Sequence, residues 1–163
     1  MSTVSAPPDT TIRALRRGDL ERVIAIDQAH AGTARRRFME RRLTEGERRP
    51  DDYVLVGVEH DGALVGFALG RLLYGEFGRV EPVAVLDAIG VDRSSQEHGY
   101  GHALMAGLLA AVRSKGVRQL HSQADWTNHG LLRFFDSTGF TLAQRVVLER
   151  DTTQAMDESG EDL

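Results

Sequence analysis

The stretch AVLDAIGVDRSSQEHGYG, residues 84–101, decides how the chain folds. It begins as an apolar, β-branched strand, continues as a short polar loop with two glycines, and opens directly into an apolar, helix-spaced run from His102 to Val112. Glycine lets anionic oxygens come close to backbone N–H groups, and the first N–H groups of a helix have no internal partner and carry a partial positive charge. The stretch therefore predicts a site for a phosphate or pyrophosphate.

The loop differs from two common phosphate-binding motifs but resembles a third. It lacks both the Gly-Lys-Ser/Thr of nucleotide-triphosphate loops and the third glycine of the dinucleotide fingerprint. Gln96–Gly101, QEHGYG, resembles the Gln/Arg-x-x-Gly-x-Gly/Ala acetyl-CoA loop of the GNAT N-acetyltransferase superfamily. Asn128–Phe140, NHGLLRFFDSTGF, resembles the Asn-led helix of that superfamily, which ends in Tyr-Glu-x-x-Gly-Phe. The resemblance covers roughly residues 11–150.

The composition is that of one globular domain. The chain has 163 residues, 41% hydrophobic and 27% charged, and no apolar run approaches the length of a membrane span. We expect a disordered stretch over residues 1–10, one domain over 11–151 and an acidic, flexible tail over 152–163. The N-terminus lacks a basic and then apolar signal pattern, so we expect an untargeted, cytoplasmic protein with no membrane partner.

The charge and the lack of cysteine exclude some functions. With no cysteine, the chain can form neither a disulfide nor a Cys-acyl intermediate. The net charge of −4 argues against a nucleic-acid partner.

Apolar spacing predicts the elements near the N-terminus. Thr11–Leu15 reads as a strand, and a helix follows that should bury Leu20, Val23 and Ile24 and leave Glu21 and Asp27 outside. A second helix is expected over Ala34–Glu45, with Phe38 and Leu43 as its core contacts.

This second helix is dense in arginine: Arg35, Arg36, Arg37, Arg41 and Arg42. One interpretation is a patch for an acidic substrate or a nucleic acid. The other, which we favour, is a solvated face whose arginines pair with Glu40, Glu45 and Glu47. In the superfamily this region borders the acceptor side of the cleft, so the resemblance keeps the patch as a possible substrate determinant.

The remaining strands and helices follow from turn signals. Tyr53–His60 and Ala63–Leu73 read as a hairpin around Asp61-Gly62. After the central helix we expect a strand over Gln119–Asp125, a helix capped by Asn128, and closing strands from Phe140 onward and over Val146–Leu148. The sequence thus predicts an α/β fold with a mixed sheet. The resemblance implies more, namely about four flanking helices and two parallel strands, Ala84–Val91 and Gln119–Asp125, that splay apart to admit the cofactor.

The resemblance also implies the residues that hold acetyl-CoA. The backbone from about Glu97 to His102 would bind the pyrophosphate, and the pantetheine would run along Ile89–Val91. The implied set is Ile89, Gly90, Val91, Gln96, Glu97, His98, Gly99, Tyr100, Gly101, His102, Asn128 and Phe135. Two positions depart from the family pattern, since His98 replaces the usual Arg or Lys and Glu97 adds a negative charge, so we expect a weaker electrostatic attraction for the phosphates.

Asp87 is the first candidate for a catalytic base. It interrupts an otherwise apolar strand beside the expected thioester. Desolvation there disfavours the charged carboxylate, so an acid at this position indicates a functional role. The alternative is a structural aspartate that is hydrogen-bonded to a neighbouring element. Glu81 and Asp125 are the reserve candidates.

Two aromatic positions bear on the chemistry. In the superfamily a Tyr on the Asn-led helix often protonates the leaving thiolate, and the matching residue here is Phe135, which has no proton to donate. Trp126, the only tryptophan, is a candidate wall for the acceptor or a packing residue. His98 and His102 have no obvious third ligand, so we expect no metal.

The leading hypothesis is an acetyl-CoA-dependent N-acetyltransferase that acts on a primary amine of a protein or a small molecule. The alternative is an acyl-CoA-binding regulatory module with weak or no catalysis, which the Phe135 substitution favours. A homodimer is common in the superfamily and is possible here.

Overall fold

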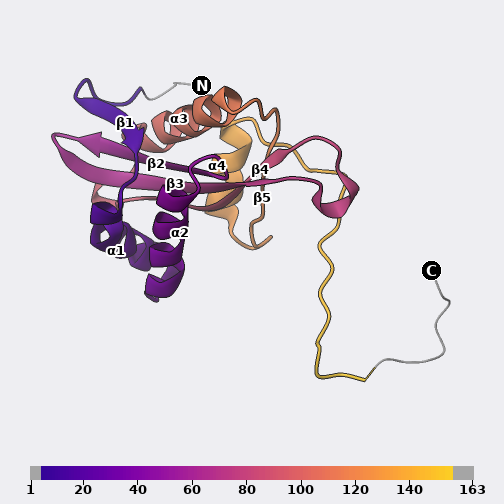
Figure 1. The fold of residues 1–163 in the computed structure, drawn as a ribbon. Helices are drawn as coiled ribbons and strands as arrows, with labels where there is room; N and C mark the ends of the chain where they lie inside the picture. Colours follow the sequence, from indigo (N-terminus) through magenta and orange to yellow (C-terminus); the bar gives the residue numbers. More distant parts are fainter. Residues whose placement is uncertain (1–4, 156–163) are drawn as a thin grey trace.

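The computed structural model describes residues 5–155, and the ends of the chain, residues 1–4 and 156–163, lie outside it. The expectations of disorder over 1–10 and 152–163 therefore fall partly outside the described residues. A five-stranded sheet in the order β1-β2-β3-β4-β5 forms the centre (Figure 1). The strands are β1 (Thr10–Ala14), β2 (Tyr53–His60), β3 (Ala63–Leu73), β4 (Val83–Val91) and β5 (Leu120–Ser122).

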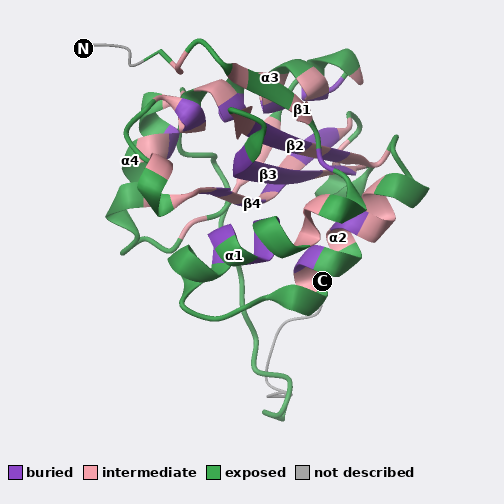
Figure 2. Ribbon diagram, turned by 90° about the vertical axis from the view of Figure 1, so that its left-hand side faces the viewer, coloured by how far each residue is buried: buried purple, intermediate pink, exposed green. Residues whose placement is uncertain are grey.

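Helices cover both faces of this sheet. They are α1 (Leu20–Ala31), α2 (Arg36–Arg48), α3 (Tyr100–Ser114) and α4 (His129–Ser137), and short 3-10 turns lie at Arg17–Asp19, Glu76–Gly78 and Arg93–Ser95. α3 and α4 pack on one face, and α1 and α2 on the other (Figures 1 and 2). The middle strands are buried on both sides, which explains their nearly continuous apolar sequences.

The β2–β3 hairpin forms as its sequence predicts. Asp61 and Gly62 both have positive φ angles, 50° and 75°, as a two-residue hairpin turn of this kind requires. Gly66 lies where a Cβ would stand 2.8 Å from a methyl of Val58 and 3.0 Å from the carbonyl oxygen of Gly90. This close packing accounts for a glycine inside a strand.

The pairing of β3 with β4 contains a β-bulge at Asp87. Leu69 pairs with Ala88 and Gly70 with Leu86, so Asp87 is the extra residue in β4. A bulge bends its strand and increases the local twist. The bulge lies where β4 separates from β5. The parallel pairing of these two strands covers only Ala84–Leu86 against Leu120–Ser122. The expected mixed sheet, with two parallel strands that separate, is confirmed.

The bounds of the second helix and the exposure of Asp27 need correction. α2 begins and ends later than predicted, at Arg36 and Arg48. Phe38 and Leu43 contact the core as predicted, and Met39, which was not predicted, is fully buried in the same cluster. Asp27 was expected outside, but it is 5% exposed. The helical spacing of α1 places it beside the buried stripe, and burial of its charge is made possible by a partner, Arg35, that the local pattern cannot reveal.

The predicted strands at the C-terminal end are also corrected. β5 has three residues in place of the expected Gln119–Asp125. The closing strands expected from Phe140 and over Val146–Leu148 do not form, and residues 141–155 are exposed along an extended path away from the sheet (Figure 1). Leu142 is 98% exposed and Leu148 is 86% exposed. The apolar run Val146–Leu148 resembles a buried strand, but in the part of the chain that the structure describes no strand pairs with it.

Candidate functional site

The bulge determines which way the side chain of Asp87 points. Ala84 and Leu86 pack into the core under α3, whereas Ala88 packs into the core under α1 and α2. Because the bulge adds one residue after Leu86, Asp87 and Ala88 both face the α2 side of the sheet. The alternation then resumes, and Ile89 and Val91 pack against the α3 core. An acidic side chain is thus directed toward α2 at the point where β4 leaves β5.

Two arginines hold this carboxylate. The Nε of Arg71, on β3, donates to both carboxylate oxygens of Asp87 at 3.1 and 3.0 Å. The Nη2 of Arg42, on α2, lies 3.1 Å from Oδ2. The side chains of Asp87, Arg42 and Arg71 are 13%, 20% and 33% exposed. The cluster of these three residues, called here the Asp87 cluster, therefore carries two positive charges and one negative charge in a mostly buried place.

The arginines of α2 pair differently from the favoured interpretation. Arg35 pairs with Asp27, Arg36 with Glu21 and Arg42 with Asp87, so these three arginines find their partners on other elements. At the end of α2, Arg48 pairs with Glu45 of the same helix at 3.8 Å. The hydrogen bond from Arg35 to Asp27 raises the pKa of this guanidinium. Most of these arginines thus tie α2 to the rest of the fold, and Arg42 brings α2 into the candidate site.

The loop between β4 and α3 is built by caps and by left-handed residues. Asp92 accepts hydrogen bonds from the N–H and the hydroxyl of Ser94, at 2.9 and 2.7 Å, and also contacts Arg22. The bonds from Ser94 and, to a lesser extent, Arg22 lower the pKa of the Asp92 carboxyl. Gly99 has φ of 81° and Glu97 has φ of 66°, which is uncommon for a residue with a side chain. The loop thus enters α3 through a turn that glycine favours at Gly99.

Only part of the predicted loop set presents side chains to solvent. Gln96, Glu97, His98 and His102 are exposed, and the ring of His98 is hydrogen-bonded through Nδ1 to the carbonyl oxygen of Gln96 at 2.6 Å. Tyr100 is 4% exposed and packs in the core under α3. It can therefore serve an anion only through its backbone N–H, which lies in the first turn of α3.

Gly101 has a packing role as well. A Cβ at this position would stand 3.1 Å from the ring of Phe134, on α4. Glycine therefore lets α4 approach the first turn of α3. The His102 ring packs edge-on against the same Phe134 ring.

The Asn-led helix begins as predicted, but its aromatic residue is buried. The side-chain oxygen of Asn128 accepts a hydrogen bond from the N–H of Leu131 at 3.2 Å, which makes Asn128 the N-cap of α4. Phe135 is 8% exposed and packs against Phe140 with ring centroids 4.7 Å apart. Phe135 is therefore a core residue in this fold.

The end of β4 is held by the α1 side of the molecule. A Cβ on Gly90 would stand 3.0 Å from the Phe67 ring and 3.3 Å from Ile26, so this glycine is needed for packing. The Nε2 of His30, on α1, lies 2.6 Å from the carbonyl oxygen of Val91. Within residues 5–155, no strand pairs with the β5-side edge of β4 beyond Leu86, from Asp87 to Val91.

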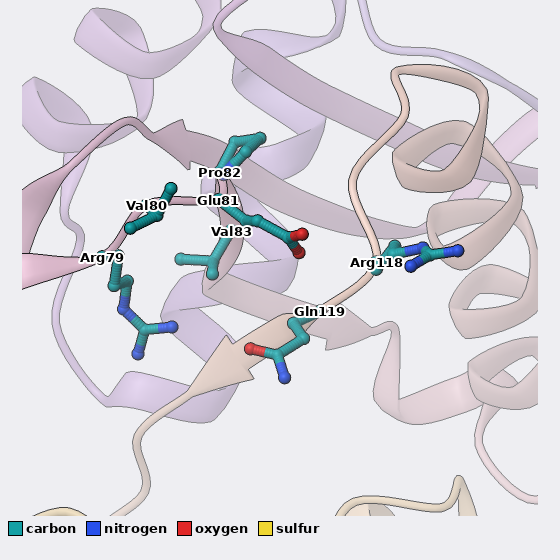
Figure 3. Close-up of a pocket in the computed structure, with 7 residues that line it drawn as sticks. All are labelled: Arg79, Val80, Glu81, Pro82, Val83, Arg118 and Gln119. Atoms are coloured by element: carbon teal, nitrogen blue, oxygen red, sulfur yellow. The ribbon is translucent and has the colours of Figure 1, made fainter.

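The reserve acids lie apart from the Asp87 cluster. Asp125 is exposed, and hydrogen bonds from the hydroxyl and the N–H of Thr127 lower its pKa. Glu81 is exposed before the start of β4 and lines a surface hollow with Arg79, Val80, Pro82, Val83, Arg118 and Gln119 (Figure 3). Trp126 is 84% exposed, so it has no packing role in the described part of the chain.

Sequence reasoning missed Arg71, although a signal was present. It is the only charged residue in the strand ALVGFALGRLL, just as Asp87 is the only charged residue in VAVLDAIGV. Opposite charges on two adjacent apolar strands are expected to pair. Arg42 could not be selected from the five arginines of its helix, because only the tertiary fold shows which one faces β4.

Two features are absent from residues 5–155. These residues contain no group of three or more His, Asp or Glu side chains placed to hold a metal ion. Within the same residues, no helix combines the length and the apolar character that crossing a bilayer requires.

Comparison with known proteins assigns the fold and the family. The acetyltransferase (GNAT) family matches residues 14–140. The mycothiol acetyltransferase of Acidothermus cellulolyticus is 31% identical over 153 residues, which cover 84% of this chain and 46% of the relative. The mycothiol acetyltransferase of Thermobispora bispora is 34% identical over 83 residues, or 51% of this chain and 28% of the relative. The chain thus spans less than half the length of these relatives.

Solved acetyltransferase structures share the fold of this chain. The aminoglycoside N-acetyltransferase AAC(6')-Iy in complex with CoA has a TM-score of 0.71 at 22% identity, covering 88% of this chain and 95% of that one. The ribosomal-protein-alanine N-acetyltransferase of Brucella melitensis has a TM-score of 0.69 at 17% identity, covering 87% and 99%. Similarity at this level of identity shows a shared fold, so the expected acyl-CoA N-acyltransferase architecture is confirmed.

Proposed function

Because the chain belongs to the acetyltransferase (GNAT) family, we propose that it transfers the acetyl group of acetyl-CoA directly to a primary amine. One observation carries the proposal: the fork between β4 and β5 opens at Leu86, and β4 then runs without a break into the glycine loop and the N-terminus of α3. A free strand edge beside an anion site suits a ligand that has an amide-rich arm and a pyrophosphate.

The residues of this chain fit acetyl-CoA at that place. The N–H groups of Tyr100, Gly101 and His102 have no intrahelical acceptor in the first turn of α3 and suit the pyrophosphate. The backbone edge of Ile89–Val91, which is not paired with β5, suits the pantetheine amides. Neighbours of the same fold have been solved with CoA and with a CoA bisubstrate analogue, which supports the placement.

The acceptor amine needs to lose a proton, and Asp87 is the proposed base. An amine of pKa near 10.4 is neutral in only about one molecule in 2,500 at pH 7, a cost of about 4.6 kcal/mol. A carboxylate offers about four lone-pair sites. The three contacts from Arg71 and Arg42 leave room for one more donor on Asp87. An amine at the fork would fill it, directly or through a water molecule.

The remaining steps have simple candidates. Backbone N–H groups near Ile89–Val91 would stabilise the tetrahedral oxyanion. The departing thiolate would take the proton released by the amine, or one from solvent, because Phe135 carries no hydroxyl and is buried.

A second function is favoured by Phe135 alone. If protonation of the thiolate is essential, the chain would bind acyl-CoA without turning it over and would act as a regulatory module. The two candidates share the CoA site and differ only in turnover.

Calorimetric titration with acetyl-CoA, followed by thiol release across a panel of amines, tests both. Binding with turnover is expected. Binding without turnover on any amine would favour the regulatory module, and absence of binding would contradict both candidates. Gly99→Val should weaken acetyl-CoA binding, because valine resists the left-handed backbone of residue 99. Gly116→Val, at another left-handed glycine with φ of 75° at the far end of α3, is the matched control and should keep binding intact.

A further inference from the structure

The arginines of the Asp87 cluster have hydrogen-bond donors that Asp87 does not satisfy. Among residues 5–155, Arg71 uses only its Nε, and its two terminal nitrogens make no hydrogen bond. The Nε of Arg42 is buried and has no hydrogen-bond partner. An unsatisfied buried donor is costly, and each one in a native structure calls for an explanation.

The surroundings of the cluster do not supply a second anion. The guanidinium carbon of Arg42 lies 5.1 Å from the centre of the Phe38 ring, and that of Arg35 lies 5.1 Å from the same ring. Arg35 is neutralised by Asp27, to which it donates at 2.9 and 2.5 Å. Within residues 5–155, Asp87 is the only carboxylate in ion-pair contact with Arg42 or Arg71, so the Asp87 cluster has one more positive than negative charge.

We propose that the Asp87 cluster binds an anionic group, a carboxylate or a phosphate, that the acceptor carries beside its reactive amine. The inference rests on the acetyltransferase function proposed above. The free edge of the Arg71 guanidinium matches the planar, two-oxygen geometry of such a group. Asp87 contacts both arginines and follows Leu86, where the pairing of β4 with β5 ends, so an acceptor held by its anion at the arginines would have its amine near the proposed base.

The excess positive charge of the Asp87 cluster disfavours polycationic acceptors. A polycation would have to approach a mostly buried cluster with an excess positive charge, and like charges repel strongly where water is scarce.

The test compares acceptors that differ in one charge. The rate of thiol release is measured with amino acids, with their carboxamides and with spermidine. Each rate is divided by the fraction of the acceptor that is present as free amine. We expect kcat/KM to be about tenfold or more higher for the acid than for the amide, as charge-assisted hydrogen bonds imply. Arg71→Met should remove this preference, Arg71→Lys should restore part of it, and Arg41→Met, on the exposed part of the same helix, should leave it unchanged.

A binding measurement makes the result independent of turnover. Succinate should raise the melting temperature of the wild-type protein and of Arg41→Met, but not that of Arg71→Met. Equal rates for acids and amides, a preference for spermidine, or no effect of succinate would overturn the inference. Failure of acetyl-CoA to bind would instead overturn the proposed function, so the two failures are distinguishable.

Discussion

At the scale of single residues, Asp87 is the side chain on which the proposed chemistry depends. Asp87→Asn keeps the size of the side chain and removes its basicity. We expect kcat/KM at neutral pH to fall by about 10²- to 10⁴-fold, which is the usual contribution of a general base, with acetyl-CoA affinity nearly unchanged. The measurement is the pH–rate profile of both proteins. An unaltered profile would show that Asp87 is not the base and that its pairing with Arg71 and Arg42 is structural.

Asp27 allows a test of burial with a matched control. Asp27 and Glu21 each accept two hydrogen bonds from one arginine, but Asp27 is buried, whereas the side chain of Glu21 is 74% exposed. Asp27→Ala should lower the free energy of unfolding by about 1–3 kcal/mol, because the partner loses a buried bond. Glu21→Ala should change it little, since water replaces an exposed partner. Equal losses in urea denaturation would mean that burial does not control the strength of these pairs.

At the scale of elements, Asp19 connects the first 3-10 turn to β1. It accepts two hydrogen bonds from Arg13 at 2.8 Å, and these bonds, with one from the N–H of Arg16, lower its pKa below the ordinary value of 3.8. A carboxyl whose pKa is lowered by folding stabilises the protein above its unfolded pKa, and this stabilisation is lost as the pH falls through the folded value.

We therefore expect Asp19→Asn to be less stable than the wild type at pH 7, with the gap closing as the pH falls below about 4. Thermal unfolding followed across this range measures the gap. A gap that persists at pH 2 would assign the effect of Asp19 to packing and not to its charge.

Local chemistry predicted some elements and missed others. The predictions of the Asp61-Gly62 turn and of the Asn128 cap were correct, because each depends on residues that are neighbours in the sequence. The burial of Asp27 and the two arginines at Asp87 were missed because their partners are distant in the chain. The loop from Gln96 to Gly101 was located by its motif, although its sequence could not show that Gly101 also makes room for Phe134.

At the scale of the whole molecule, the segment after Phe140 is the least integrated part of the described chain. Every residue from 141 to 155 is exposed, and the segment runs away from the sheet (Figure 1). Exposed, extended backbone is the preferred substrate of proteases. Trypsin should therefore cut first after Arg145 and Arg150, and mass spectrometry of a short digest identifies the sites. If these bonds were as resistant as those beside Arg13 in β1, the closing strands predicted from the sequence would form in solution after all.

The bulge in β4 determines which single-residue deletions the strand can tolerate. Ala84, Leu86, Ile89 and Val91 all face the α3 core only because residue 87 is surplus to the alternation of the strand. Deleting Asp87 would leave every one of these side chains on its present face, whereas deleting Val85 would turn part of the strand over. The shortened chain should still fold, but with the bend removed β4 would run straight alongside β5. We therefore expect the loss of this one residue to extend the pairing of β4 with β5 beyond Leu86.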